Sequence, residues 1–424
     1  MNDKTDKIIW IFHHYATPPT MTGLTRPYDF AKNLISEKYK CIIFSSSFLH
    51  YSGENIIKNN SCHCEINENN VPFVFVKTNP YKNSKLLRAK NMLDYYLNLI
   101  RITKTYANLY GKPDVIIGSS AHPLAAIAAI RLAKRYGCQS IVEIRDLWPE
   151  SFVAYNIIKK NNPILKLLYA GEKWIYKKAD KLIFTMEGGK DYIIEKGWDK
   201  EHGGPIDINK VYHINNGVDL EEFDYNKEHY VLEDEDLMDD GTFKVVYAGS
   251  IRKANNLDLI INAAKYVQEN YNYEIKFLIW GEGSEKGSLE EKCQAEDIKN
   301  VVFKGKVDKK YIPFIVSKAD INILNYSYHE IWKYGGSQNK SFEYLAAGRP
   351  ILSTIKMGYD IFEKYNAGVS LEDQSIENIG NSIVNFFKMP EDNYKVISNN
   401  ARKAAQEYDF KTLTDKLINV MESF

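Results

Sequence analysis

The stretch YGGSQNKSFEYLAAGRPIL, from Tyr334 to Leu352, has the pattern of a glycine-rich loop, an amphipathic helix and an apolar strand in immediate succession. The helical pattern starts near Asn339 or Lys340, and the pair Arg349-Pro350 separates it from the strand. Helices and strands that alternate in this way build parallel sheets, which bind ligands at the carboxyl ends of their strands. The stretch therefore predicts an α/β fold with a binding site beside this loop.

The residues of this loop and helix suit a nucleoside diphosphate. A helix start points free N–H groups and the positive end of its dipole outward, which favours an anion. Lys340 adds a charge, and Glu343 can accept two hydrogen bonds from vicinal hydroxyls such as those of a ribose. The alternative for Glu343 is a carboxylate that only caps the first helical turn. The residues expected near the ligand here are Gly336, Ser337, Asn339, Lys340, Ser341 and Glu343.

Short runs of β-branched residues alternate with helical patterns along the whole chain, which predicts two Rossmann-like, doubly wound halves facing each other across a cleft. The strands expected in the first half are 7–12, 41–45, 73–76, 114–118, 140–144, 181–185 and 211–214. Those expected in the second half are 243–248, 274–280, 301–303, 320–324, 350–353 and 368–371. The predicted domains are 1–224, an acidic linker 225–241, 242–404, and a C-terminal helix 405–424 that packs back on the first domain.

Composition narrows the class of protein. The 424 residues include 55 Lys plus Arg and 55 Asp plus Glu, so no net field favours nucleic acid. The five cysteines are odd in number and scattered, which favours reduced thiols over a disulfide framework. No run is long and apolar enough for a membrane span or a signal peptide. We expect a soluble, cytoplasmic protein without a metal.

Two short patterns could nevertheless hold a metal. Cys62-His63-Cys64 lies in a polar loop without a second pair of ligands. Asp234-Glu235-Asp236 matches a D-x-D motif, but it lies in the acidic linker rather than after an apolar strand. We therefore interpret the first as a loop and the second as a solvated linker.

Further glycine-containing turns follow the strands of the second half. Tyr247-Ala248-Gly249-Ser250-Ile251-Arg252-Lys253 is a strand end followed by a turn and two cations, which suits an anion. Gly281 and Gly283 end the next strand, where a planar base could lie against the backbone. The residues expected to bind the donor in this part of the chain are Gly249, Ser250, Lys253, Gly281, Gly283, and, after the third strand, Lys306 and Val307.

In order and spacing, these segments resemble glycosyltransferase family 4, the retaining GT-B enzymes. The segments that carry the resemblance are Gly249, Gly281-Glu282-Gly283, Val302 to Gly305, Ala319 to Leu324, Lys340 to Pro350, Tyr15 to Tyr28, Ser119 to Pro123, Glu143 to Glu150 and Asn216 to Asp219. The combination is similar to the subgroup that builds O-antigen, capsule and other bacterial surface glycans. It implies transfer of a hexosyl or N-acetylhexosaminyl group from a UDP-sugar to a polyprenyl-diphosphate-linked glycan.

The resemblance also implies roles for particular residues. Glu343 would bind the donor ribose, while Lys340 and Arg252 would meet the diphosphate. The sequence departs from the family at three positions: Gly335 replaces the first glutamate of the E-x7-E motif, and Ser250 and Asn255 replace its Arg and Lys. The missing glutamate normally grips a sugar hydroxyl, so we expect a deoxy or N-acetylated amino sugar.

The first half contributes further candidates. His122 follows a strand end, where the family often places a histidine beside the donor sugar; the alternative is a structural loop histidine. Gly23 resembles a glycine that lets N–H groups approach the diphosphate. The residues expected to bind the acceptor are Arg26, Arg145, Asp146 and Trp148, the last because an indole stacks on a sugar ring.

A basic stretch suggests one more partner. Lys82, Lys85, Arg88, Lys90, Arg101 and Lys104 are interleaved with Tyr81, Tyr95 and Tyr96, while Leu86, Leu93, Leu97 and Ile100 repeat at helical spacing. Such leucines usually face a core, yet the cations and tyrosines also suit an anionic membrane surface. Two other functions stay open: a UDP-sugar epimerase of the same fold, and a scaffold that binds nucleotide sugars without catalysis.

Overall fold

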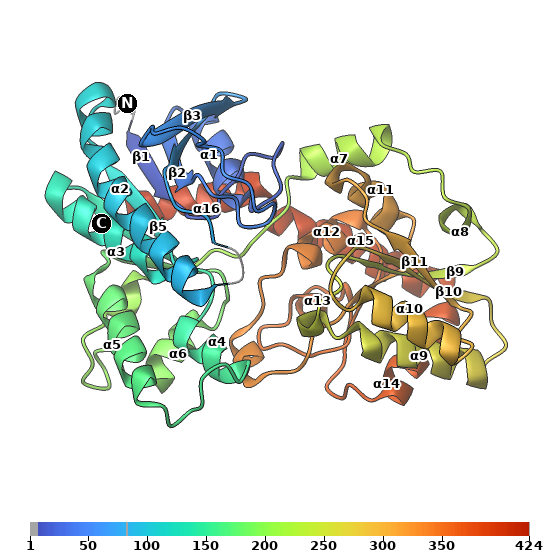
Figure 1. Cartoon of the computed structure of the whole chain (residues 1–424). Helices are drawn as coiled ribbons and strands as arrows, with labels where there is room; N and C mark the ends of the chain where they lie inside the picture. Colours follow the sequence, from blue (N-terminus) through green and yellow to red (C-terminus); the bar gives the residue numbers. More distant parts are fainter. Residues whose placement is uncertain (1–6, 82–83, 424) are drawn as a thin grey trace. The chain divides into compact units, whose positions relative to one another are not determined.

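The computed structural model describes residues 7–81 and 84–423, which form two compact units (Figure 1). Unit 1 contains the described residues up to Asn215 together with those from Leu413 onward, and unit 2 runs from Asn216 to Thr412. The boundary therefore lies at Asn215/Asn216 rather than at residue 224. Each unit is an α/β structure built on its own sheet, as the alternating sequence pattern predicts.

Unit 1 is built on an eight-stranded sheet with the order β3-β4-β2-β1-β5-β6-β7-β8, in which only β3 runs antiparallel to its neighbour. The strands are β1 (Ile8–Phe12), β2 (Lys40–Ser46), β3 (His63–Glu68), β4 (Val71–Val76), β5 (Val115–Ser119), β6 (Gln139–Ile144), β7 (Lys181–Phe184) and β8 (Val211–His213). All seven strands predicted for this half are confirmed, and β3 is an addition at the sheet edge.

Helices cover both faces of this sheet. They are α1 (Arg26–Ser36), α2 (Lys85–Tyr110), α3 (Pro123–Tyr136), α4 (Trp148–Ala154), α5 (Pro163–Lys178), α6 (Gly189–Glu195) and α16 (Phe410–Glu422). Trp10, Phe12 and Phe44 pack against the adjacent helices α2 and α3 on one face. On the other face, Phe30 of α1 and Leu417 of α16 lie over the inner strands.

The face of α2 that packs on the core is not the face that carries Leu86, Leu93 and Leu97. Leu86 is 84% exposed, and Leu93 and Leu97 are also exposed. Tyr95 and Tyr96, expected on the basic surface, are buried, and the Tyr95 hydroxyl donates to the Phe44 carbonyl at 2.7 Å. The expectation that Tyr95 and Tyr96 belong to the basic surface is therefore wrong, and of the two interpretations left open for the leucines, the core face does not hold for Leu86, Leu93 and Leu97. Lys82 lies outside the described residues.

Unit 2 is built on a six-stranded parallel sheet with the order β11-β10-β9-β12-β13-β14. Its strands are β9 (Phe243–Ala248), β10 (Ile275–Trp280), β11 (Val301–Gly305), β12 (Ile321–Leu324), β13 (Ile351–Ser353) and β14 (Gly368–Ser370), all of them predicted. Its helices are α7 (Leu220–His229), α8 (Glu235–Met238), α9 (Leu257–Asn270), α10 (Lys286–Ala295), α11 (Ile312–Ser317), α12 (Asn339–Ala347), α13 (Ile361–Lys364), α14 (Ile376–Phe387) and α15 (Glu391–Glu407). One face packs on α9 and α14, the other on α11, α12 and α15.

The acidic stretch 225–241 lies inside unit 2 and includes the short helix α8. Asp234 and Asp236 both pair with Lys304, at 2.7 and 2.6 Å, and Asp236 also pairs with Lys276 at 2.9 Å. These lysines lower the pKa of Asp236. The carboxylates of the D-x-D pattern are thus engaged by lysines of the neighbouring strands rather than solvated in a linker.

Among residues 7–81 and 84–423, none of the helices combines the length and the apolar character that a membrane span requires.

Candidate functional site

The Gly249 turn and the Gly281 turn of unit 2 are joined through their backbones. The Gly249 N–H donates to Trp280 O at 2.9 Å and the Ile251 N–H to Glu282 O at 3.0 Å. A Cβ on Gly281 would lie 1.7 Å from Gly249 O, and one on Gly283 would lie 2.0 Å from Ile251 O. Backbone packing therefore requires both glycines, a reason that is independent of any bound base.

Lys340 reaches across to this turn from the first turn of α12. Its Nζ donates to the Tyr247 hydroxyl at 2.7 Å and lies 4.2 Å from the centre of the Tyr247 ring. A Cβ on Gly249 would lie 2.6 Å from the same Nζ, so any other residue here would displace the ammonium from its position. The structure thus places Gly249 and Lys340 next to each other. Both residues were expected to contact the donor.

Burial lowers the pKa of Lys340 to about 7, and the nearby Glu343 carboxylate opposes this shift only in part. Burial also raises the pKa of Tyr247, so its hydroxyl stays protonated and donates to Ser250 O at 2.8 Å. At neutral pH the site therefore holds a lysine close to half-protonated, whose charged form an arriving anion would stabilise.

Glu343 lies one turn further along α12 and does not cap it. The N-cap residue is Gln338, and no side chain caps the helix start. Burial raises the pKa of the half-buried Glu343, while Lys309 and Lys340 act in the opposite direction. Within the described part of the chain its carboxylate accepts no hydrogen bond. The capping alternative for Glu343 is therefore wrong.

The remaining predicted donor residues fall into two groups. Ser337 and Gly336 hold the loop before α12: the Ser337 hydroxyl accepts from the Asn216 N–H at 3.0 Å, and a Cβ on Gly336 would strike Met357. Ser341 is buried at the helix start, and Ser250 bonds Asn255 at 3.1 Å. The others are Arg252, Lys253, Lys306 and Asn339, which are exposed, and Val307, which packs at the edge of the core.

Sequence reasoning missed three residues at this site. Tyr247 holds Lys340, the Tyr326 ring lies 5.4 Å from the same ammonium, and the Lys309 charge acts on Glu343. Tyr247 lies near the end of β9, and Tyr326 and Lys309 follow β12 and β11. Their positions at or just after strand ends could have indicated them in the sequence, because the carboxyl ends of parallel strands meet at one sheet edge.

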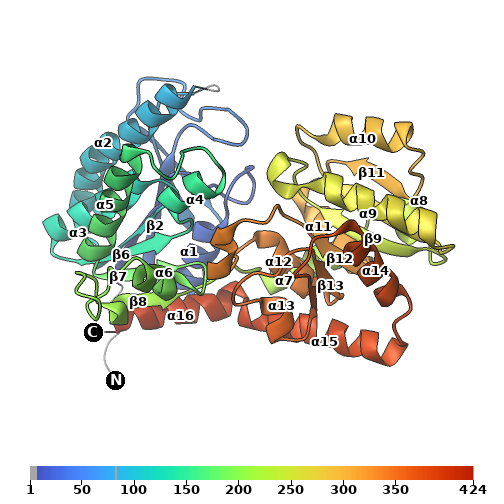
Figure 2. The same cartoon turned by 90° about the horizontal axis from the view of Figure 1, so that it is seen from below.

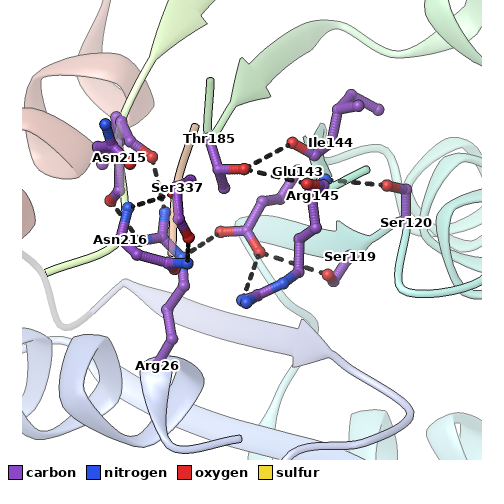
Figure 3. Close-up of polar contacts among 11 residues, drawn as sticks. Arg26, Ser119, Ser120, Glu143, Ile144, Arg145, Thr185, Asn215, Asn216 and Ser337 are labelled. Atoms are coloured by element: carbon purple, nitrogen blue, oxygen red, sulfur yellow. Dashed lines mark hydrogen bonds and ion pairs between the residues drawn. The ribbon is translucent and has the colours of Figure 1, made fainter. Parts of the chain in front are cut away.

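In unit 1, Arg26 is a buried residue that links β6 to the segment after β8, rather than a residue of an acceptor surface. Its side chain is 4% exposed, its Nε donates to Glu143 at 2.8 Å, and its other nitrogens donate to the carbonyls of Ile214 and Asn215 (Figure 3). Burial raises the pKa of Glu143, but the charges of Arg26 and Arg145 prevail and lower it to about 2. The guanidinium of Arg26 therefore makes its hydrogen bonds inside the unit.

The other predicted acceptor residues follow β6. The Arg145 guanidinium lies 3.8 Å from Glu143, and its backbone N–H donates to Ser120 at 3.1 Å (Figure 3). Asp146 is exposed, and Trp148 is half-buried at the start of α4 with its ring 5.2 Å from that of Phe152. Asp146 and Trp148 line the same apolar groove.

His122 is buried at the start of α3. Its ring packs edge-on against His14 at 4.4 Å, and neither ring nitrogen has a hydrogen-bond partner among the described residues. Burial, with the charges of His13 and Arg88, lowers the pKa of His122 to about 3. The imidazole is therefore neutral at physiological pH and can donate a hydrogen bond, but it is not a proton-carrying acid.

Gly23 packs against Thr17, whose side-chain oxygen would lie 2.3 Å from an added Cβ. The loop is further closed by a hydrogen bond from the Thr17 N–H to Leu24 O at 3.1 Å. The glycine is thus required by the loop itself. Within residues 7–81 and 84–423, no three His, Cys, Asp or Glu side chains are grouped as metal ligands.

Two family models match the chain, one mainly over unit 1 and the other within unit 2. Residues 25–222 match the family model described as Glycosyltransferase Family 4, and residues 232–404 match the model described as Glycosyl transferases group 1. A search of curated protein sequences finds no match.

Solved structures match nearly the whole chain. Sucrose-phosphate synthase from Thermosynechococcus elongatus is 15% identical with a TM-score of 0.70, covering 97% of this chain and 98% of that one. HepE from Anabaena, solved in complex with UDP, is 13% identical with a TM-score of 0.68, covering 99% and 100%. WaaG, a glycosyltransferase involved in lipopolysaccharide biosynthesis, is 14% identical with a TM-score of 0.63, covering 98% and 100%.

The two units and these matches define the class: the protein is a GT-B glycosyltransferase. Within that class, the models matched by the two halves indicate a family 4-like enzyme.

Proposed function

We propose that the protein transfers a sugar from UDP to a lipid-linked or surface glycan, with retention at the anomeric carbon. The observation that carries the proposal is the Lys340 ammonium held against the Gly249 turn, one helical turn before Glu343. A cation beside a helix start suits a departing diphosphate, and a carboxylate that accepts no hydrogen bond in the described chain suits ribose hydroxyls. The complex of the fold neighbour HepE with UDP supports the choice of nucleotide.

Glu343→Ala is expected to weaken UDP binding by about tenfold to a hundredfold, because a hydrogen bond to a charged group contributes roughly 1.5–3 kcal/mol. The melting temperature should change little, since the carboxylate is half-buried and bonds nothing in the described chain. Calorimetry with UDP and with 2′,3′-dideoxy-UDP measures the effect. The ribose assignment requires that the variant loses affinity for UDP only; equal losses for both nucleotides would contradict it.

UDP affinity should depend on pH through Lys340. Its pKa is about 7 in the free protein. A bound diphosphate favours the charged form and raises this pKa, so binding above pH 7 takes up a proton and affinity falls as the pH rises. Calorimetry in buffers of different ionisation enthalpy should show an uptake approaching about one proton at pH 8. No uptake, or the same uptake in Lys340→Met, would contradict the assignment.

One departure from the family's sequence pattern narrows the choice of donor sugar and of glycan product. Gly335 stands where the first glutamate of the E-x7-E motif would grip a sugar hydroxyl, and its φ of 93° favours glycine. We propose an N-acetylated or deoxy amino sugar, and a product that belongs to O-antigen, capsule or a related polysaccharide. No metal is required in this scheme, because Lys340 and the start of α12 can stabilise the diphosphate.

Peripheral contact with an anionic membrane is supported by α2. Exposed Leu86, Leu93 and Leu97 share this helix with Lys85, Arg88 and Lys90, and apolar side chains flanked by cations are typical of helices that lie at a bilayer surface. The protein should therefore sediment with anionic vesicles and lose that binding as salt is added. Replacing Lys85 and Arg88 by Glu should weaken sedimentation; unchanged binding would return α2 to an ordinary solvent face.

One assay separates the proposed transferase from its alternatives. The protein is incubated with UDP-sugars in EDTA, with and without a polyprenyl-diphosphate-linked glycan. Release of UDP that depends on the glycan supports the transferase. Isomerised UDP-sugar without the glycan would indicate an epimerase, and neither product would indicate a scaffold, for which Gly335 is the best argument. Activity restored only by added Mg²⁺ or Mn²⁺ would contradict the metal-free scheme.

A further inference from the structure

An apolar groove lies between three helices of unit 1, which stand close together in Figure 2. We call it the α4–α5 groove. It has a volume of about 140 Å³ and is lined mainly by Ile127 of α3, Trp148 and Phe152 of α4, and Leu167, Leu168 and Gly171 of α5. By the same measure, a cavity of about 10–15 Å³ is enough to hold one water molecule. The groove is therefore a site of ligand size with apolar walls.

Few polar side chains line the groove, and each of them either lies at a strand end or has hydrogen-bond partners of its own. Ser120 and the candidate acceptor residue Asp146 lie at the carboxyl ends of β5 and β6. Glu172 also lines the groove, but its carboxylate accepts hydrogen bonds from the hydroxyls of Tyr176 at 2.7 Å and Tyr192 at 2.8 Å. The α5 side of the groove is thus almost wholly apolar, while its other side adjoins Asp146 and Trp148.

Gly171 opens the groove at a point where the fold does not require glycine. It lies inside α5, its φ is not positive, and a Cβ built on it has no atom within 4 Å. A glycine inside a helix is less stable than alanine, because it adds backbone entropy to the unfolded chain. The structure gives this glycine no packing reason, and its effect is to leave space open along the groove.

The surface around the groove is apolar and basic. Ile164, Leu167 and Trp174 are 54%, 72% and 37% exposed and, with Gly171, follow each other along one side of α5. Residues 155–178 contain six lysines, at 159, 160, 166, 173, 177 and 178, and one acidic residue, the buried Glu172. An apolar stripe flanked by cations suits a ligand that joins a hydrocarbon chain to an anionic head.

We propose that the α4–α5 groove binds the isoprenoid chain of a lipid-diphosphate-linked glycan acceptor, with Asp146 and Trp148 at the end nearer the sugar. The inference rests on the proposed function for its acceptor. A linear chain fits an open apolar groove, and the lysines complement the diphosphate. The sugar hydroxyls then fall on the side of the groove where Asp146 and Trp148 follow β6.

The test fills the groove instead of damaging it. Gly171→Leu places a side chain in the open space, and Gly171→Ala is the matched control that removes the glycine without filling the groove. Both variants should melt at or above the temperature of the wild type, because they replace a glycine inside a helix. Calorimetry with farnesyl diphosphate and with inorganic diphosphate, in saturating UDP, measures binding away from the nucleotide site.

Wild type and Gly171→Ala should bind farnesyl diphosphate more tightly than inorganic diphosphate, and Gly171→Leu should lose at least tenfold in affinity for the farnesyl compound alone. Equal farnesyl binding by Gly171→Leu and wild type, or no preference for the farnesyl compound, would overturn the proposal. So would a matching loss of Gly171→Leu binding to phosphatidylglycerol vesicles without isoprenoid, which would make the groove a general bilayer contact.

The readout separates this proposal from the function on which it rests. Farnesyl diphosphate binding needs no sugar transfer, so it can succeed if the assay with UDP-sugars finds no product. Conversely, wild-type transfer to a lipid-linked glycan with an unchanged KM in Gly171→Leu would leave the transferase standing and remove the chain from the α4–α5 groove.

Discussion

Lys340→Met is expected to lower kcat by about 10²- to 10³-fold, the scale for losing one positioned group that stabilises a developing charge. Methionine keeps the length and apolar stem of the side chain but removes the ammonium that contacts Tyr247 and the Gly249 turn. UDP affinity should fall as well, because the diphosphate loses a charge-assisted contact.

The same variant should be more stable than the wild type. Folding lowers the pKa of Lys340 from 10.5 to about 7, so the charged lysine opposes folding at every pH below about 10. Removing it raises the melting temperature while activity is lost. Lys265→Met, which removes a half-buried lysine of α9 that pairs with Glu296 at 3.0 Å, is the control at a distant ion pair and should change neither property by much. Full activity in Lys340→Met would contradict the role of the ammonium.

His122→Ala should lower kcat by about 10²-fold with nearly constant UDP affinity, if the neutral imidazole donates a hydrogen bond to the donor sugar. The ring lies at the carboxyl end of β5, buried, with both nitrogens unpartnered in the described structure. A buried polar group without a partner costs stability, and a ligand that bonds it removes that cost. Turnover and nucleotide binding would then be separated in this variant.

His122→Phe distinguishes this role from packing. Phenylalanine can keep the edge-on contacts with His14 and Tyr95 but cannot donate a hydrogen bond. We expect kcat per folded molecule to fall as far in His122→Phe as in His122→Ala, while only the alanine variant melts much earlier. Normal turnover in His122→Phe would remove His122 from the catalytic site and leave it a structural residue.

The strands could be predicted from the sequence because parallel strands covered on both faces are continuous apolar runs. The exception, β3, is polar and alternating, since it is an edge strand that pairs only with β4. Its sequence signal is the pair Asn69-Asn70 between the two strands. Both residues have positive φ, at 48° and 68°, as a tight hairpin turn requires.

The orientation of α2 could not be read from its leucines because two stripes run along it. Leu86, Leu93 and Leu97 repeat at helical spacing, yet the core face is formed by Tyr95, Leu99 and residues at the same spacing. Tyrosines bury more area than leucines, and the Tyr95 hydroxyl finds a backbone partner inside. Which of two competing stripes faces the sheet depends on the sheet, and that information is not local.

The site could be predicted where it follows strand ends and not where it depends on distant pairs. Gly249, Lys340 and Glu343 fall in loops and a helix start that the strand pattern places at one sheet edge. Arg26, by contrast, meets Glu143 and Asn215, far along the chain, and no local pattern marks its burial. Gly281 likewise has a packing reason that only the neighbouring turn makes visible.

The path of the chain also bears on how the protein is made. Unit 2 is a continuous segment, so all its strands are available once residue 412 has been synthesised. Unit 1 is completed only after α16 has been synthesised, because this helix supplies Leu417 to its sheet and Glu422, which accepts a 2.8 Å hydrogen bond from Tyr39. Until then, apolar strand residues such as Ile11 and Ile183 are not covered by that helix. A nascent chain arrested before this point is therefore one that chaperones would be expected to hold.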